Sequence, residues 1–198
     1  MSTVFYLHMG GTSMSPPPDQ SADGSVRPLD LYQLAETDLG NASGVVISMA
    51  ADQRYLAQQR EQLEDFVGGG GRVALTGHPV ERILPGQGGF RTLDYGAPTE
   101  LYLAPGDPHP VWSGVDLLDA SARNGITGFY ARGFTVNHPP GATITTRIGP
   151  QRLACDYVYA YGKGRILIHP GIEFAVFRED RNSAALLHPQ LMDWLASR

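Results

Sequence analysis

The sequence has very little cysteine and no long apolar run. Its 198 residues include one cysteine, Cys155, which excludes an internal disulfide and a cysteine-rich zinc site. No apolar stretch approaches the roughly 20 residues that a membrane-spanning helix needs. The first residues also lack the basic region and apolar core of a secretory signal. We therefore expect a cytoplasmic protein that has no membrane partner.

Basic residues are few and scattered. There are 15 Lys and Arg against 20 Asp and Glu, and the formal net charge is −5. Without a basic stripe to neutralise phosphates, we expect no nucleic-acid partner. A composition of 42% hydrophobic and 18% charged residues is typical of a folded chain, and its length suits one core. We expect a single domain over residues 1–198.

Apolar runs at residues 4–7, 44–49 and 72–76 predict buried strands. Between the last two runs, residues 53–67 carry an apolar stripe at helical spacing, and Asp52 is placed to cap the first amides of that helix. A strand, a helix and a strand within about 30 residues form a βαβ unit, whose crossover makes the two strands parallel. The pattern therefore predicts an α/β fold with a mainly parallel sheet.

The C-terminal part predicts a β-hairpin and a helix. Residues 153–161 alternate in polarity, and a glycine-rich turn leads to a strand at 165–168. A short terminal helix is expected over 189–196, where proline suits the first turn and apolar residues share a face. Residues 10–28 are too polar and too rich in proline for regular structure, so we expect a loop there, with a possible role in covering a site.

Three histidines follow predicted strands. His8 and His169 come directly after apolar runs, and His78 follows the run at 72–76. The carboxyl ends of parallel strands meet at one edge of the sheet, where open α/β folds bind ligands. Imidazole changes charge near neutral pH and binds metals, so the three rings suit acid/base chemistry, metal binding or the lining of a ligand pocket. Strand-end histidines also serve to cap backbone groups, and that structural interpretation stays open.

Other candidate ligand-binding residues fall at the same edge. Gly10 and Gly11 follow the first strand and offer backbone amides to an anion. Neither a dinucleotide nor a Walker motif surrounds them, so a nucleotide is not expected. Asp52 also faces this edge, although its position favours a helix cap over a catalytic acid.

Several stretches resemble a known family when they are taken in order. They are residues 51–54, 63–67 and 70–78 (GGRVALTGH), the HPVWSGV sequence at 109–115, and the YGKGR sequence at 161–165. Together they resemble the class I glutamine amidotransferase-like superfamily, and within it ThuA-like proteins and related bacterial proteins. The resemblance implies a flavodoxin-like three-layer sandwich.

The resemblance also implies a test of chemistry. The family carries a cysteine nucleophile on the turn after the strand that ends here at Thr76, and His78 stands in its place. Cys155 lies in an alternating strand with no base nearby in sequence, so cysteine-dependent glutamine hydrolysis is not expected. The sequence at His169 resembles the family's HPE motif, but Gly171 replaces the glutamate. Glu173, two residues later, is then the acid that the resemblance pairs with His169.

Three functional hypotheses follow. In the first, the domain binds a small polar metabolite, which includes sugar-derived ones, at the carboxyl edge of the sheet. His78 or His169 then acts as general acid/base in a hydrolytic or isomerising reaction, and Glu173 orients His169. No cofactor is expected.

The second hypothesis is a non-catalytic scaffold or sensing module, because the family's nucleophile is absent and a fold does not determine function. Such scaffolds commonly pair through exposed faces, so a homo-oligomer is expected under it. The third is a metal-dependent hydrolase whose ligands are His8, His78 and His169 with Asp52 or Glu173. No short-spaced pair of ligands supports the third hypothesis.

Overall fold

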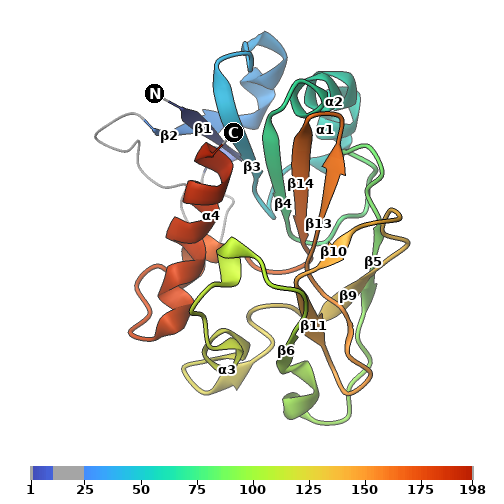
Figure 1. Ribbon diagram of the computed structural model, residues 1–198, viewed down its shortest axis with the longest axis vertical. Coiled ribbons are helices and arrows are strands. Elements are labelled where there is room, and N and C mark those ends of the chain that lie inside the picture. The colour runs from blue at the N-terminus through green and yellow to red at the C-terminus, as the bar shows by residue number, and fades with distance from the viewer. Residues whose placement is uncertain (1, 11–24, 198) are drawn as a thin grey trace.

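The computed structural model describes residues 2–10 and 25–197. Within these residues, seven strands form the main sheet, in the spatial order β10-β13-β14-β4-β3-β1-β2 (Figure 1). They are β1 (Thr3–His8), β2 (Val26–Asp30), β3 (Ala42–Ile47), β4 (Arg72–Thr76), β10 (Thr143–Ile144), β13 (Tyr157–Tyr161) and β14 (Gly164–His169).

The middle of the sheet is parallel. β14, β4, β3, β1 and β2 run in the same direction, whereas β13 is antiparallel to β14 and β10 is antiparallel to β13. The predicted α/β class, the mainly parallel sheet and the β13–β14 hairpin are therefore present. All six residues of β3 are buried, as its continuous apolar run predicts for a strand covered on both faces.

Helices cover both faces of this sheet. The α-helices are α1 (Gln53–Gln58), α2 (Arg60–Gly68), α3 (Leu117–Ser121) and α4 (Leu187–Ala196); shorter 3-10 turns are η2 (Leu31–Glu36), η3 (Pro98–Leu101), η4 (Pro110–Trp112), η5 (Phe174–Phe177) and η6 (Ser183–Leu186). One apolar cluster joins the sheet to α1, α2 and η2, and a second joins it to α4, η4 and η5. Figure 1 shows α4 and the α1–α2 pair on different sides of the strands.

The predicted helix at 53–67 is interrupted. Its N-terminus is capped as expected, because the Asp52 carboxylate accepts hydrogen bonds from the amides of Arg54 and Tyr55. The backbone leaves the helical conformation at Gln59, which separates α1 from α2. The apolar stripe continues through the break, with Leu56 on α1 and Leu63 on α2 both buried.

One expectation about the N-terminal loop is wrong. Residues 26–28 belong to β2, an edge strand that pairs in parallel with β1. Pro28 is compatible with this position because an edge strand leaves one row of amides unpaired, so a missing N–H costs no ladder bond. The rest of the expected loop, residues 11–24, lies outside the described residues, as does its expected role as a cover.

The middle of the chain forms small sheets beyond the end of the main one. They are β5 (Gly89–Thr92) with β9 (Gly133–Val136), β6 (Leu103–Pro105) with β11 (Thr146–Ile148) and β12 (Leu153–Ala154), and β7 (Ala122–Arg123) with β8 (Ile126–Thr127). The predicted strand at 153–161 is thus divided at residues 155–156 between two sheets. Within the described residues, no helix is both long and apolar enough to span a membrane.

Candidate functional site

The three histidines lie along one edge but do not meet. His169 ends β14 and His8 ends β1, while His78 follows β4 by two residues. β4 and β3 separate β14 from β1, and neighbouring strands are about 4.8 Å apart, so β14 and β1 are separated by roughly 14 Å. That separation is too large for His8 and His169 to contact each other. The shared edge is present, but it is not one histidine pocket.

His169 is fully buried, and both of its ring nitrogens have partners. Nδ1 lies 2.6 Å from Oδ1 of Asp156, and Nε2 lies 2.8 Å from the carbonyl oxygen of Ile172. Both ring nitrogens are therefore engaged inside the protein. The rings of Tyr130 and Phe174 pack against the imidazole. No nitrogen of His169 remains to take a proton from a substrate.

Asp156 is the centre of this buried cluster. Its Oδ2 accepts hydrogen bonds from the hydroxyls of Tyr130, at 2.6 Å, and Thr146. The Trp112 indole donates in turn to the Tyr130 hydroxyl at 2.8 Å. Each polar group therefore satisfies another, as buried polar groups require.

The predicted His169–Glu173 pair is wrong, because both ring nitrogens of His169 have other partners and the Glu173 carboxylate is bonded to Tyr6 and Ser48. Gly171 packs so closely that a Cβ there would lie 1.7 Å from the carbonyl oxygen of Tyr130 and 2.9 Å from Nε2 of His169. A glutamate at position 171 is excluded by this contact. Asp156, brought in from the segment before β13, supplies the carboxylate to His169 instead.

Glu173 forms a second buried cluster. Its Oε1 accepts hydrogen bonds from the Ser48 hydroxyl and from the backbone amide of Met49 at 3.2 Å, and its Oε2 accepts one from the Tyr6 hydroxyl at 2.9 Å. Burial, followed by the charge of Glu173, raises the pKa of Tyr6 well above its usual range, so its hydroxyl remains a donor. This carboxylate ties the ends of β1 and β3 to the segment after β14.

His78 is the exposed histidine of the edge. It follows Gly77, whose φ of +89° and close approach to Met49 leave no room for a side chain. The imidazole stacks on the ring of Phe90, with ring centres 4.0 Å apart. Partial burial, and then the nearby His169, lower the pKa of His78 below its usual 6.5. The ring is therefore neutral at pH 7 and open to solvent.

The expected ligand-binding residues also occupy this edge, in structural roles. Nδ1 of His8 accepts a hydrogen bond from the amide of Gly10 at 2.9 Å. Asp52 caps α1, and the backbone amide of Tyr55, ahead of other causes, lowers the pKa of its carboxyl. Gly11 lies outside the described residues.

Cysteine and metal chemistry find no support in the geometry. Cys155 is fully buried, and burial, together with the charge of Asp156, raises the pKa of its thiol well above the usual value. It is inert as a nucleophile in that state. In the part of the chain that the structure describes, no three His, Cys, Asp or Glu side chains are grouped to hold a metal ion.

Sequence reasoning missed Asp156 and its partners. The available signal was a single charged residue between Cys155 and Tyr157, inside an otherwise apolar strand pattern. Such a residue is rarely buried without a partner. Which partner it takes depends on Tyr130 and Thr146, which are distant in sequence.

Comparisons with known proteins define the fold class only. No protein-family model matches the sequence, and no curated protein matches it. Among solved structures, the chain is similar over its whole length to two cytoplasmic proteins of Salmonella typhimurium. One is 14% identical with a TM-score of 0.61 and the other, from strain LT2, is 10% identical with a TM-score of 0.57, and each is covered completely.

The chain is also similar to part of a larger enzyme. A cold-adapted β-galactosidase from Rahnella sp. R3 matches all of this chain with 32% of its own, at 15% identity and a TM-score of 0.54. At these identities the matches establish a shared α/β architecture. They carry no residue of one protein over to the other.

Proposed function

We propose that this chain is an amidotransferase-like domain, with a flavodoxin-like three-layer arrangement and no cysteine nucleophile, that binds a small polar metabolite at the carboxyl edge of its sheet. The observation that carries the proposal is that an exposed histidine stands on a turn that packs against the hydrogen-bonded Glu173 cluster. His78 stands on the Gly77 turn, Gly77 touches Met49, and the amide of Met49 is held by Glu173. Ligands of open α/β sheets bind at this edge.

The buried clusters position this edge. Glu173 and His169 have their partners inside the protein, so in this proposal they hold the strand ends in place and do not touch the ligand. His78 is the residue that meets the ligand. Because its pKa lies below 6.5, it is neutral at pH 7 and can act as a general base if the bound metabolite reacts.

A sugar-derived ligand is the first class to test. The region of similar fold makes up 32% of the β-galactosidase chain, so this architecture occurs within a sugar-processing enzyme. The similarity is one of fold. It sets the order of a screen and assigns no substrate.

The test is a ligand screen on the full chain by thermal shift, followed by calorimetry. Neutral sugars and amides are compared on the unaltered protein and on His78→Ala. We expect at least one sugar to stabilise the protein and the His78→Ala variant to lose at least tenfold in affinity. His138→Ala, a change of an exposed loop histidine that is not one of the three strand-end histidines, is the matched control. Equal affinity of the unaltered protein and His78→Ala would contradict the proposal.

A non-catalytic scaffold is the second candidate, and one observation favours it. His169 and Glu173, two of the three residues expected to be catalytic, are fully used in internal hydrogen bonds. A stable oligomer in solution by light scattering, together with no response to any ligand, supports the scaffold. A monomer that responds to one class of metabolite supports the binding site.

A further inference from the structure

A cavity of about 900 Å³ opens on the α4 face of the sheet, at the end where β4 and β14 begin. Its wall includes Arg72, Arg165 and Trp194. A second cavity of about 490 Å³ adjoins it, and His109 lines both. Ligand clefts in proteins measure roughly 300–1,000 Å³, so the space suits a small metabolite. Neither wall includes His8, Asp52, His78, His169 or Glu173, although Trp112 of the Asp156 cluster lines the second cavity.

Two arginines stand side by side in the first cavity. Arg72 and Arg165 are register partners on neighbouring strands. Arg72 donates to the carbonyl of Trp194 at 2.6 Å and to the Ser197 hydroxyl at 2.7 Å, while its guanidinium lies 5.2 Å from the Trp194 ring centre. Among the described residues, the Arg165 side chain has no hydrogen bond or ion pair.

Within residues 2–10 and 25–197, no ion pair balances the charge of these arginines. Burial lowers the pKa of Arg72, and repulsion from the Arg165 guanidinium lowers it further. This local positive charge occurs in a protein with a formal net charge of −5. An anion bound between the two groups removes the repulsion.

His109 adds a neutral donor between the two cavities. Its Nδ1 accepts a hydrogen bond from the amide of Val111 at 3.3 Å, so the ring hydrogen lies on Nε2. Burial, followed by Arg72 and Arg165, lowers the pKa of His109 to about 4. The ring centre lies 5.4 Å from that of Trp112 and 5.6 Å from that of Trp194. At neutral pH the ring is therefore a fixed N–H donor.

Two buried polar atoms on these walls lack a partner. Thr145, which is 4% exposed, lines the second cavity, and its hydroxyl has no hydrogen bond. Gln190 lines the first cavity, and its side-chain nitrogen is likewise buried and unpaired. Both atoms are enclosed by surrounding protein atoms, so neither is counted among the groups that meet a ligand.

Acceptors are also present, which narrows the ligand class. The carboxylate of Asp193 lines the first cavity and that of Asp107 lines the second. Carboxylates repel a second anionic group but accept hydrogen bonds from hydroxyls. A molecule with one anionic end and several hydroxyls matches both sets of groups.

We propose that these joined cavities bind the phosphate monoester of a sugar. The phosphate lies between Arg72 and Arg165, and hydroxyls of the sugar meet Asp193. Paired guanidiniums suit a phosphate dianion because each offers several N–H donors in a planar fork. The phosphate position, where β4 and β14 begin, is at the opposite end of these strands from the carboxyl edge, and the proposal does not depend on the function proposed for that edge.

Tryptophan fluorescence provides a direct test. The chain has two tryptophans, of which Trp194 lines the first cavity and Trp112 lines the second. We expect glucose 6-phosphate to change the emission of the full-length protein saturably, while glucose has at least tenfold weaker effect. Arg165→Gln should weaken the response at least tenfold.

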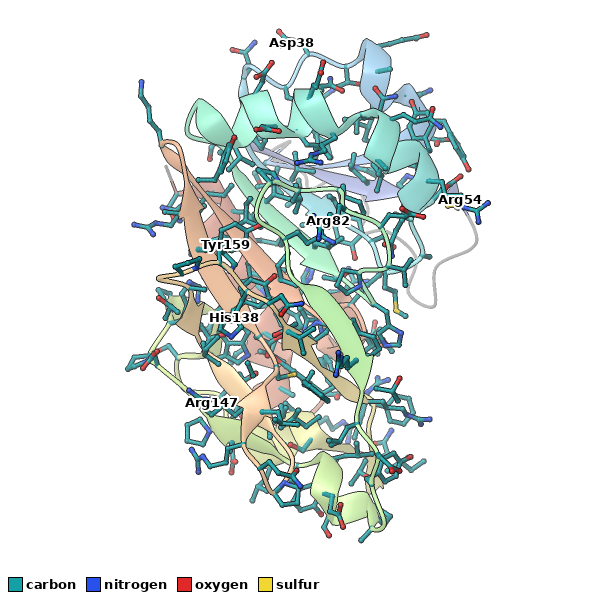
Figure 2. All side chains as sticks on the ribbon, turned by 90° about the vertical axis from the view of Figure 1, so that its right-hand side faces the viewer. Asp38, Arg54, Arg82, His138, Arg147 and Tyr159 are labelled. Carbon is teal, nitrogen blue, oxygen red and sulfur yellow. The ribbon has the colours of Figure 1, made fainter. Side chains whose placement is uncertain are left out.

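The matched control is Arg54→Gln. Arg54 is an exposed arginine on α1. Figure 2 shows it well apart from Tyr159, which lines the first cavity. Its replacement should leave the titration unchanged. Arg165 is itself exposed on its strand, so the Arg165→Gln variant should fold, and circular dichroism verifies this.

Three outcomes overturn the proposal. The first is no saturable change with glucose 6-phosphate. The second is glucuronate binding as tightly as the phosphate ester, because the site would then select a carboxylate. The third is a response that persists in Arg165→Gln and disappears in His78→Ala, since the ester would then bind at the carboxyl edge.

Discussion

Polar side chains at the two ends of the parallel strands differ in whether they have partners inside the protein. At the carboxyl end, His169 and Glu173 are buried, and partners from distant segments satisfy them. At the amino end, among the residues that the structure describes, Arg165 has no ion pair and the side-chain nitrogen of Gln190 has no hydrogen bond. The side chains of Arg165 and His169 nevertheless point to the same face of the sheet, because they are four residues apart on β14.

This difference separates architecture from binding capacity. A buried group with all its bonds made inside the protein stabilises the fold, and its removal leaves other groups unpaired. A donor that faces a cavity without a partner contributes little to the fold and is available to a ligand. The sequence draws attention to the first kind of group, and the structure points to the second.

Among the changes that test this comparison, Asp156→Asn is expected to have the largest effect on stability. The change leaves the buried His169 without a carboxylate and turns an N–H toward a donor, so we expect a loss of about 3–5 kcal/mol in the free energy of unfolding. Urea denaturation measures it. Asp94→Asn, at an exposed position, is the control. A loss below about 1 kcal/mol for Asp156→Asn would show that the cluster is not structural.

A smaller loss is expected from Glu173→Gln. The amide keeps the size of the side chain but replaces one acceptor by a donor, next to the Ser48 or Tyr6 hydroxyl, at a cost of about 1–3 kcal/mol. Tyr6→Phe removes one of these donors, so the double variant should lose less than the sum of the two single changes. Strict additivity in urea denaturation argues against the cluster.

The half-buried His109 and the buried His188 should make stability fall in mild acid. Burial, ahead of nearby arginines, lowers the pKa of both His109 and His188 from 6.5 to about 4. Between these pH values the unfolded chain binds more protons than the folded one. The free energy of unfolding should therefore decrease as the pH drops from 6.5 to 4 and vary little with these groups above 6.5.

The measurement is a series of urea denaturation curves between pH 4.5 and 7.5, recorded at intervals of about 0.5 pH unit. His109→Gln and His188→Gln should each make the decrease shallower, because each removes one titrating group. An identical pH dependence in all three proteins would mean that other groups cause the acid sensitivity.

The smallest effect is expected from Arg165→Gln. Because the guanidinium is exposed and unpaired, its loss should change the free energy of unfolding by no more than about 0.5 kcal/mol, with relief of repulsion on Arg72 favouring a slight gain. Urea denaturation without added phosphate tests this. A loss of more than about 1 kcal/mol would place Arg165 among the structural groups and remove the contrast between the two ends.

Much of the fold could be predicted because its signals are local. The apolar run at β4 and the capping position of Asp52 depend on residues within a few positions of each other, and both were predicted correctly. β2 was missed because an edge strand containing proline has the composition of a loop. The break at Gln59 was missed because the apolar stripe continues through it.

The candidate site was less accessible to sequence reasoning. That the ends of β1, β4 and β14 share an edge follows from parallel pairing, and it is present. The partner of His169 does not follow, because the short spacing to Glu173 suggests a pair, whereas the fold brings in Asp156 from the segment before β13. The cavity at the amino end combines residues from strands, from η4 and from α4, and no local pattern joins them.

The sequence by itself determined which segments are strands and helices, since backbone preference and the spacing of apolar residues act over a few positions. It also determined that a cysteine mechanism is unsupported. Only the tertiary structure decided which polar groups pair with each other and which face open space. Those contacts join residues up to 167 positions apart in the chain, as in the bond from Tyr6 to Glu173, and they depend on how the layers pack.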